Sequence, residues 1–69
     1  MSTKKSLSKL MTELQQFLST HSIPQRRLAL HLGMDESQLS RYFTGRHAPS
    51  LETFQRLVEA AEYLAEQKR

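Results

Sequence analysis

The apolar residues of the chain recur at helical spacing. In the first stretch they are spaced i, i+3, i+4, i+7, i+10 and i+11, at Leu7, Leu10, Met11, Leu14, Phe17 and Leu18. Residues three and four apart share one face of a helix, so this stretch predicts an amphipathic helix with its Met and Phe in the core. No alternation of β-branched residues predicts a strand. The pattern therefore indicates an all-α fold.

Residues 25–43 predict two short helices joined by a tight turn. Their apolar stripes are Leu28, Ala29 and Leu32 in the first helix, and Leu39, Tyr42 and Phe43 in the second. Gly33 stands where a helix end favours a left-handed residue without a Cβ, and Gly45 ends the second helix in the same way. Asp35 begins that helix, where its carboxylate can accept from the backbone N–H of Ser37 or Gln38.

A last helix is predicted from Ser50 almost to the end of the chain. Ser50 is an N-cap residue and Glu52 favours the positive end of the helix dipole. The helical period is kept by Leu51, Phe54, Leu57, Val58, Ala61, Leu64 and Ala65. Because this stripe continues past the point where a small core is full, Tyr63 and Leu64 are predicted dimer contacts. The alternative is that this helix folds back over the first one.

The second short helix also has a polar face, formed by Glu36, Ser37, Ser40 and Arg41. Two short helices that cross at a small elbow, the second with its polar face free, make a helix-turn-helix. The linked motifs are Gln25-x-x-Leu28-Ala29, Leu32-Gly33-Met34-Asp35, Leu39-Ser40-Arg41-Tyr42 and Gly45-Arg46-x-x-Pro49-Ser50-Leu51. Over residues 23–58 the chain resembles the Cro/repressor-type (XRE) helix-turn-helix family of phage and bacterial regulators. Pro24, in place of a capping Ser or Thr, and Phe43, in place of Glu, depart from its pattern.

This resemblance implies a lambda-repressor-like domain of four to five helices spanning residues 1–69, with the helix-turn-helix at about 25–43. The polar, basic residues 1–5 predict a flexible arm. The implied DNA base contacts are Glu36, Ser37, Gln38 and Arg41. The implied phosphate contacts are Gln25, Arg26, Ser40, Thr44, Arg46 and His47. Arg41 matters most for sequence discrimination, because a guanidinium can pair with guanine O6 and N7. Glu36 either accepts from cytosine N4 or only stabilises the helix start.

Composition is compatible with this interpretation. The chain has 69 residues, a net charge of +3 and no cysteine, and its pI is about 9.7. An anionic partner is therefore plausible, and the absence of thiols fits a reducing bacterial cytoplasm. The first ten residues lack the apolar segment of a signal peptide, and no apolar run is long enough to span a membrane. We expect no cofactor, no metal and no small-molecule substrate.

Two functions compete for this fold. The first is a sequence-specific regulator of transcription, most often a repressor in this family, which binds a palindromic double-stranded DNA operator as a homodimer. The second is an antitoxin-like module whose polar helix face binds a protein; the acidic start of that helix keeps this alternative open. Catalysis is poorly supported, because His21, His31 and His47 have neither the spacing of metal ligands nor that of a nucleophile and its base.

Overall fold

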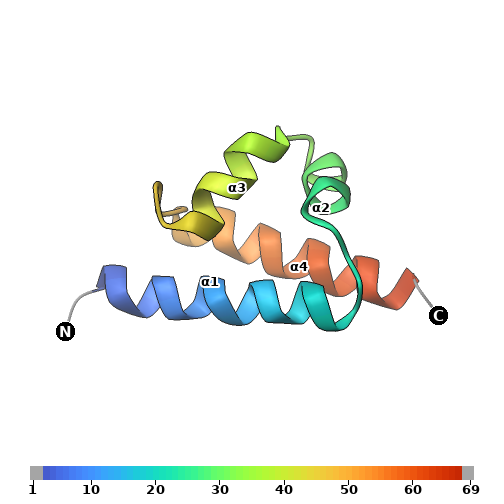
Figure 1. Cartoon of the computed structure of the whole chain (residues 1–69), viewed down its shortest axis with the longest axis horizontal. Coiled ribbons are helices and arrows are strands. Elements are labelled where there is room, and N and C mark those ends of the chain that lie inside the picture. The colour runs from blue at the N-terminus through green and yellow to red at the C-terminus, as the bar shows by residue number, and fades with distance from the viewer. Residues whose placement is uncertain (1–2, 68–69) are drawn as a thin grey trace.

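Two long helices support two short ones. The computed structural model describes residues 3–67, with side chains from Ser8 onward, and comprises α1 (Thr3–Thr20), α2 (Gln25–Leu32), α3 (Glu36–Thr44) and α4 (Leu51–Gln67). In Figure 1, α1 and α4 run alongside each other as a lower layer, and α2 and α3 lie above them. The all-α prediction is confirmed, with four helices in the described part of the chain.

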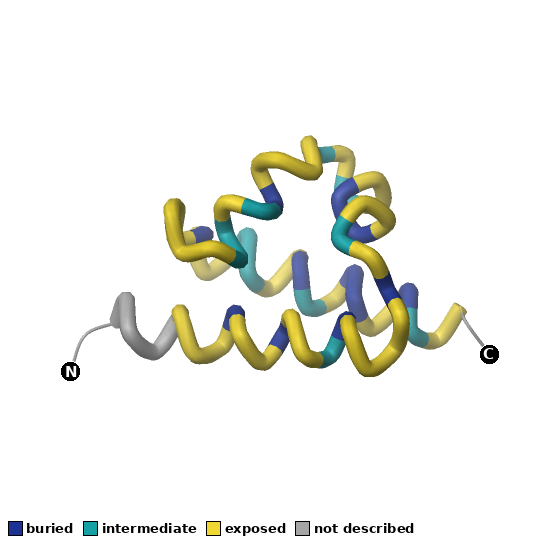
Figure 2. Tube along the Cα trace, viewed as in Figure 1, coloured by how far each residue is buried: buried dark blue, intermediate teal, exposed yellow. Residues whose placement is uncertain are grey.

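The core lies between these two layers. Its centre consists of three leucines that are 0% exposed, Leu28 from α2, Leu39 from α3 and Leu57 from α4. The other buried core residues are Met11, Leu14, Leu18, Ile23, Ala29, Ala60, Ala61 and Leu64. Figure 2 shows the buried turns facing inward and the outer surface of α3 exposed. Each of the four helices therefore contributes to one apolar centre.

Three helices end with the same backbone motif, in which a residue with positive φ is followed by a six-to-one hydrogen bond. The residues with positive φ are Ser22 (56°), Gly33 (71°) and Gly45 (83°). The N–H donors and carbonyl acceptors are Ile23 to Leu18 (2.8 Å), Met34 to Ala29 (3.0 Å) and Arg46 to Arg41 (3.0 Å). Both glycines thus occupy the left-handed positions that the sequence predicts. The end of α1 has the same conformation with a serine.

Several sequence-based expectations need correction. Residues 3–5, expected in a flexible arm, belong to α1, and the rest of that arm, residues 1–2, lies outside the described residues. Asp35 is the N-cap residue of α3, but its carboxylate makes no capping hydrogen bond. Leu51, placed on the apolar stripe of the last helix, is 71% exposed because it precedes the stretch of α4 that packs on the core.

The predicted cap of α4 is present. The Thr53 N–H donates to Ser50 Oγ at 3.1 Å, and Ser50 Oγ donates to Thr53 Oγ1 at 2.9 Å. Ser50→Ala removes this acceptor and should lower the free energy of unfolding by about 1 kcal/mol. Urea denaturation followed by circular dichroism at 222 nm measures the change. The matched control is Ser8→Ala at an exposed position of α1, where alanine should leave stability equal or slightly higher; equal losses in both variants would contradict the capping role.

Gly33 tests the turn between α2 and α3. A Cβ at this position would meet no atom within 4 Å, so its positive φ of 71° is the only obstacle to a side chain. Gly33→Ala should therefore destabilise the fold by about 1–2 kcal/mol, the cost of a left-handed conformation with a Cβ. Gly33→Asn should cost less, because asparagine tolerates that conformation better. An alanine variant as stable as wild type in thermal unfolding would show that the turn does not need glycine.

Candidate nucleic-acid interface

The outward face of α3 presents polar side chains over a shallow hollow. The hollow has a volume of about 380 Å³ and is lined by Asp35, Ser37, Gln38, Arg41, Tyr42, His47 and Ala48. All of these except the half-buried Tyr42 are exposed. Burial of Leu39 on the opposite side of α3 fixes this orientation. The helix therefore offers hydrogen-bond donors and acceptors to a surface that approaches it from outside.

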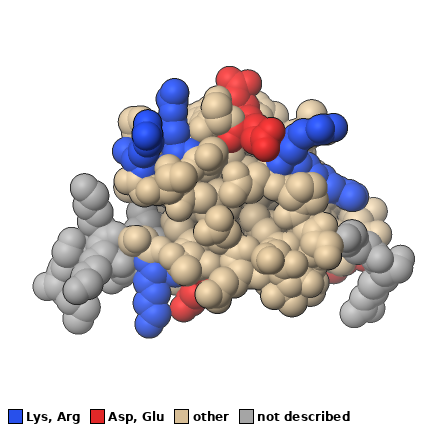
Figure 3. Space-filling model, in the orientation of Figure 1, with Lys and Arg blue, Asp and Glu red and all other residues tan. Residues whose placement is uncertain are grey.

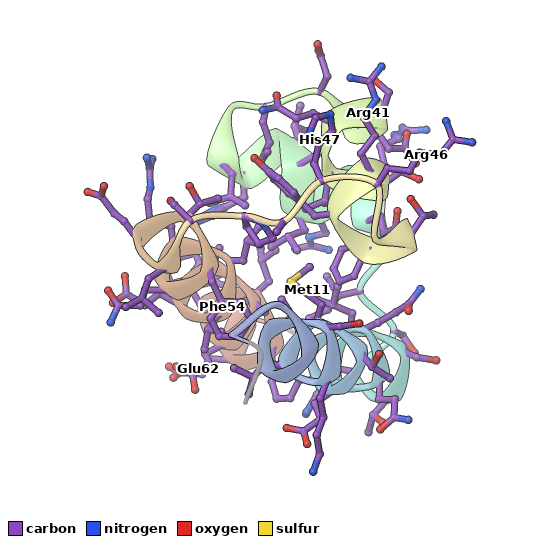
Figure 4. The ribbon with its side chains drawn as sticks, turned by 90° about the vertical axis from the view of Figure 1, so that its left-hand side faces the viewer. Met11, Arg41, Arg46, His47, Phe54 and Glu62 are labelled. Carbon is purple, nitrogen blue, oxygen red and sulfur yellow. The ribbon has the colours of Figure 1, made fainter. Side chains whose placement is uncertain are left out.

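The carbonyl oxygen of Arg41 ties the following loop to α3. It accepts from the backbone N–H groups of Arg46 at 3.0 Å and His47 at 3.3 Å. It also accepts from Thr44 Oγ1 at 3.3 Å. Figure 4 shows the labelled side chains of Arg41, Arg46 and His47 on the same side of the molecule. The start of the basic loop is thus held to the end of α3 by three hydrogen bonds to one carbonyl oxygen.

The starts of α2 and α3 differ from the start of α4. Pro24 precedes α2 and Asp35 precedes α3, and neither makes a side-chain capping hydrogen bond. The start of α4 is capped by Ser50. The first N–H groups of a helix without a side-chain cap can bind water or an anion. The two helices of the helix-turn-helix therefore keep this capacity.

Charge on this side of the molecule is arranged in three parts. In Figure 3, blue atoms stand on either side of a red group at the top of the molecule, above the layer of α1 and α4. The cations of the helix-turn-helix and its loop are Arg26, Arg27, Arg41 and Arg46, and its acids are Asp35 and Glu36. All six are exposed. A surface with cations on both flanks and acids between them suits a ligand with two lines of negative charge.

The structure brings together most of the predicted contact residues. Ser37, Gln38 and Arg41 line the hollow with His47, and Thr44 and Arg46 belong to the element tied to the Arg41 carbonyl. Gln25 and Arg26 lie apart from these, at the start of α2. Glu36 is exposed and Ser40 is half-buried, and neither lines the hollow.

Asp35 lies on the first exposed turn of α3, and the sequence favoured a structural role for it, as the N-cap, over a base contact. In the structure its carboxylate makes no capping hydrogen bond, and the residue borders the hollow. No signal in the sequence distinguishes these two roles, because an aspartate at the N-cap position can adopt either rotamer.

The predicted dimer contacts differ from each other in exposure. Tyr63 is 51% exposed, whereas Leu64 is 5% exposed and part of the core. The prediction for Leu64 is therefore wrong, because a side chain already enclosed by its own helices has no surface left for a second copy. Tyr63 stacks on His31 of α2, with ring centroids 5.1 Å apart. That contact links the C-terminal part of α4 to α2.

Other kinds of site were also sought. Among residues 3–67 there is no group of three or more His, Cys, Asp or Glu residues that could hold a metal ion. No helix in this same range is both long enough and apolar enough to cross a bilayer.

Comparison with known proteins agrees with this geometry. A family model described as Helix-turn-helix matches residues 20–63, which include all of α2 and α3 and most of α4. Searches of curated proteins and of solved structures find no match. The family match covers more than half of the chain and contains both helices, the turn and the basic loop described above. The chain therefore belongs to the Cro/repressor-type (XRE) helix-turn-helix family of DNA-binding regulators.

Proposed function

We propose that this protein is a transcriptional repressor that binds a palindromic DNA operator as a homodimer, with α3 in the major groove. In this proposal the protein represses by occupying promoter DNA. The observation that carries the proposal is the position of Arg41. It is exposed on the outward face of α3, and it makes no ion pair with any described residue. Its guanidinium is therefore available for a bidentate contact with guanine.

The neighbours of Arg41 supply the rest of a base-reading surface. Ser37 and Gln38 border the same hollow, and both can donate and accept hydrogen bonds. Glu36 and the unpaired carboxylate of Asp35 are acceptors only, so they suit the amino groups of cytosine or adenine and disfavour a nearby phosphate. We infer that the acidic start of α3 lies over base edges rather than over the DNA backbone.

The flanks of this surface suit the two phosphate strands. Gln25 and Arg26 stand at the start of α2, where Pro24 leaves the first N–H groups without a side-chain cap. On the other flank, Thr44, Arg46 and His47 are held to the end of α3 by the Arg41 carbonyl. Such contacts fix the register of a protein on DNA without reading its sequence. Ser40 is retained as a phosphate contact from the family resemblance.

A dimer is proposed because one copy has few base contacts. Typical operator binding by such domains uses two half-sites about one helical turn apart, one for each copy. Figure 1 places α2 and the C-terminal part of α4 at the same end of the molecule, where Tyr63 is half exposed. We infer a two-fold axis at this end that runs perpendicular to the outward face of α3, since that direction puts both α3 helices on the same side, as binding to one DNA molecule requires.

The division between base and phosphate contacts gives a direct test. Binding to a random duplex library should enrich a palindrome, and Arg41→Ala should relax one position in each half-site at a cost of about 1–3 kcal/mol. Arg41→Lys should also relax that position, because an ammonium lacks the planar fork. Arg46→Ala should weaken all sequences alike and reduce the slope of log affinity against log salt by about 1.

The same library experiment separates the alternatives. Weak binding without an enriched sequence would overturn the regulator proposal and favour a helix-turn-helix that binds a protein. An enriched palindrome that Arg41→Ala leaves unchanged would preserve DNA recognition but remove Arg41 from its assigned role.

Dimerisation is tested by Tyr63→Glu. A charge at a two-fold contact faces the same charge on the second copy, so the variant should sediment as a monomer. It should bind full palindromes at least about tenfold more weakly, while its affinity for a half-site stays unchanged. Leu51→Glu is the matched control, because Leu51 is also an exposed apolar residue of α4 but lies at its other end. A wild-type protein that is monomeric on a full palindrome would contradict the dimer.

A further inference from the structure

The side of the molecule turned away from α3 carries an apolar groove. It lies between α1 and α4 and has a volume of about 290 Å³. Leu10, Leu14 and Phe17 of α1 line one wall, and Phe54, Val58 and Ala61 of α4 line the other. Leu10 is 42% exposed, and Phe17, Phe54 and Val58 are half-buried. The long helices thus keep apolar surface accessible after the core is filled.

The rim of the groove is acidic. Glu13 borders it on α1 and Glu62 borders it on α4, and both are exposed. Helix α4 also carries Glu52, Glu59 and Glu66 against one arginine, Arg56, so its net charge is −3 in a chain whose total is +3. Neither glutamate of the rim forms an ion pair with a described residue. Apolar walls between unpaired carboxylates complement a ligand with apolar and cationic positions side by side.

The groove is directed away from the DNA-binding surface. Figure 4 looks along α1 and α4, and it shows Phe54 and Glu62 at the lower left and Arg41, Arg46 and His47 at the upper right. A second copy bound through this groove by a two-fold axis would point its α3 away from the first, so the two copies could not read adjacent half-sites. The operator dimer therefore leaves the groove free. Moreover, residues 10–17 lie outside the family match at 20–63, so one wall of the groove is formed by a part of the chain beyond that match.

We propose that this groove binds a basic amphipathic helix of another protein, while α3 is on DNA. Apolar residues at i, i+3 or i+4 and i+7 of that helix enter the groove, and Lys or Arg residues beside them pair with Glu13 and Glu62. Such a partner would connect the DNA-bound regulator to a second protein without competing for the operator. This inference extends the proposed function and rests on a separate surface.

The test uses the full chain and a displayed library of helical peptides. Each peptide has leucine fixed at i, i+4 and i+7, with Lys or Glu allowed at the flanking positions. Selection on wild-type protein should enrich lysine at those positions, and the affinity of a selected peptide, measured by fluorescence anisotropy, should fall at least about tenfold with Leu10→Lys. The double variant Glu13→Lys/Glu62→Lys should reverse the preference to glutamate.

Glu59→Lys is the matched control for Glu62→Lys alone, which is measured beside the double variant, since it makes the same charge change on α4 but at the side that faces His31 and Tyr63. It should alter the affinity by no more than about twofold, the effect of net charge alone. Each variant is checked for an unchanged circular dichroism spectrum. No enrichment of lysine, or a selected peptide insensitive to Leu10→Lys, would overturn the proposal.

Two further measurements distinguish binding of a partner helix from self-association through the groove and from competition with DNA. If wild type self-associates and Leu10→Lys abolishes that association, the groove belongs to a second copy and the proposal fails. The affinity of the peptide for the protein–duplex complex should match its affinity for the free protein, once the binding seen with the Leu10→Lys complex is subtracted. Displacement of the duplex by the peptide would also overturn the proposal. Loss of operator specificity in the library experiment would instead refute the proposed function and leave the peptide result standing.

Discussion

The packing of α3 on the core through Leu39 is the interaction on which the rest of the structure depends. Helices of eight and nine residues, such as α2 and α3, are too short to be stable in water by themselves. They persist because Leu28 and Leu39 are fully buried in the same apolar core as Leu57 of the long helix α4. Burial of one leucine is worth about 1.5–3 kcal/mol, and a domain of this size rarely has more than about 3–5 kcal/mol of net stability. The recognition surface therefore exists only while this contact is made.

The two sides of α3 have separate requirements. Its inner side needs apolar side chains that pack on the core, whereas its outer side needs polar side chains without partners inside the protein. The unpaired Arg41, the uncapped start of α3 and the carboxylate of Asp35 are polar groups that the fold itself does not use. At the start of α4, by contrast, Ser50 satisfies the helix terminus internally. The chain thus leaves hydrogen-bonding capacity open at the helix ends that belong to the helix-turn-helix.

Much of this fold could be predicted from the sequence because local rules determine it. The helical periods, Gly33, Gly45 and the Ser50 cap each depend on a few neighbouring residues, and the structure has them where expected. The errors at Leu64 and Leu51 have a common cause in tertiary packing. Periodicity placed Leu64 and Leu51 on one stripe, but it could not reveal that the fold buries the first in the core and leaves the second 71% exposed.

The candidate site was predictable only in part, for a similar reason. Spacing along one helix indicated which residues share the outer face of α3, and Ser37, Gln38 and Arg41 indeed border one hollow. The attachment of Arg46 and His47 to the Arg41 carbonyl depends on how the backbone turns after Gly45. The rotamer of Asp35 and the apolar groove between α1 and α4 also depend on three-dimensional arrangement, and neither has a signature in the sequence.

The repeated end motif of α1, α2 and α3 has a consequence for how fast the chain folds. Each motif closes within six residues, and the connections between helices span only residues 21–24, 33–35 and 45–50. Helix ends and turns can therefore form before distant parts of the chain meet. Chains dominated by such local contacts fold in microseconds to milliseconds. For a domain with so little stability to spare, rapid refolding means that a copy that opens recovers the outward face of α3 almost at once.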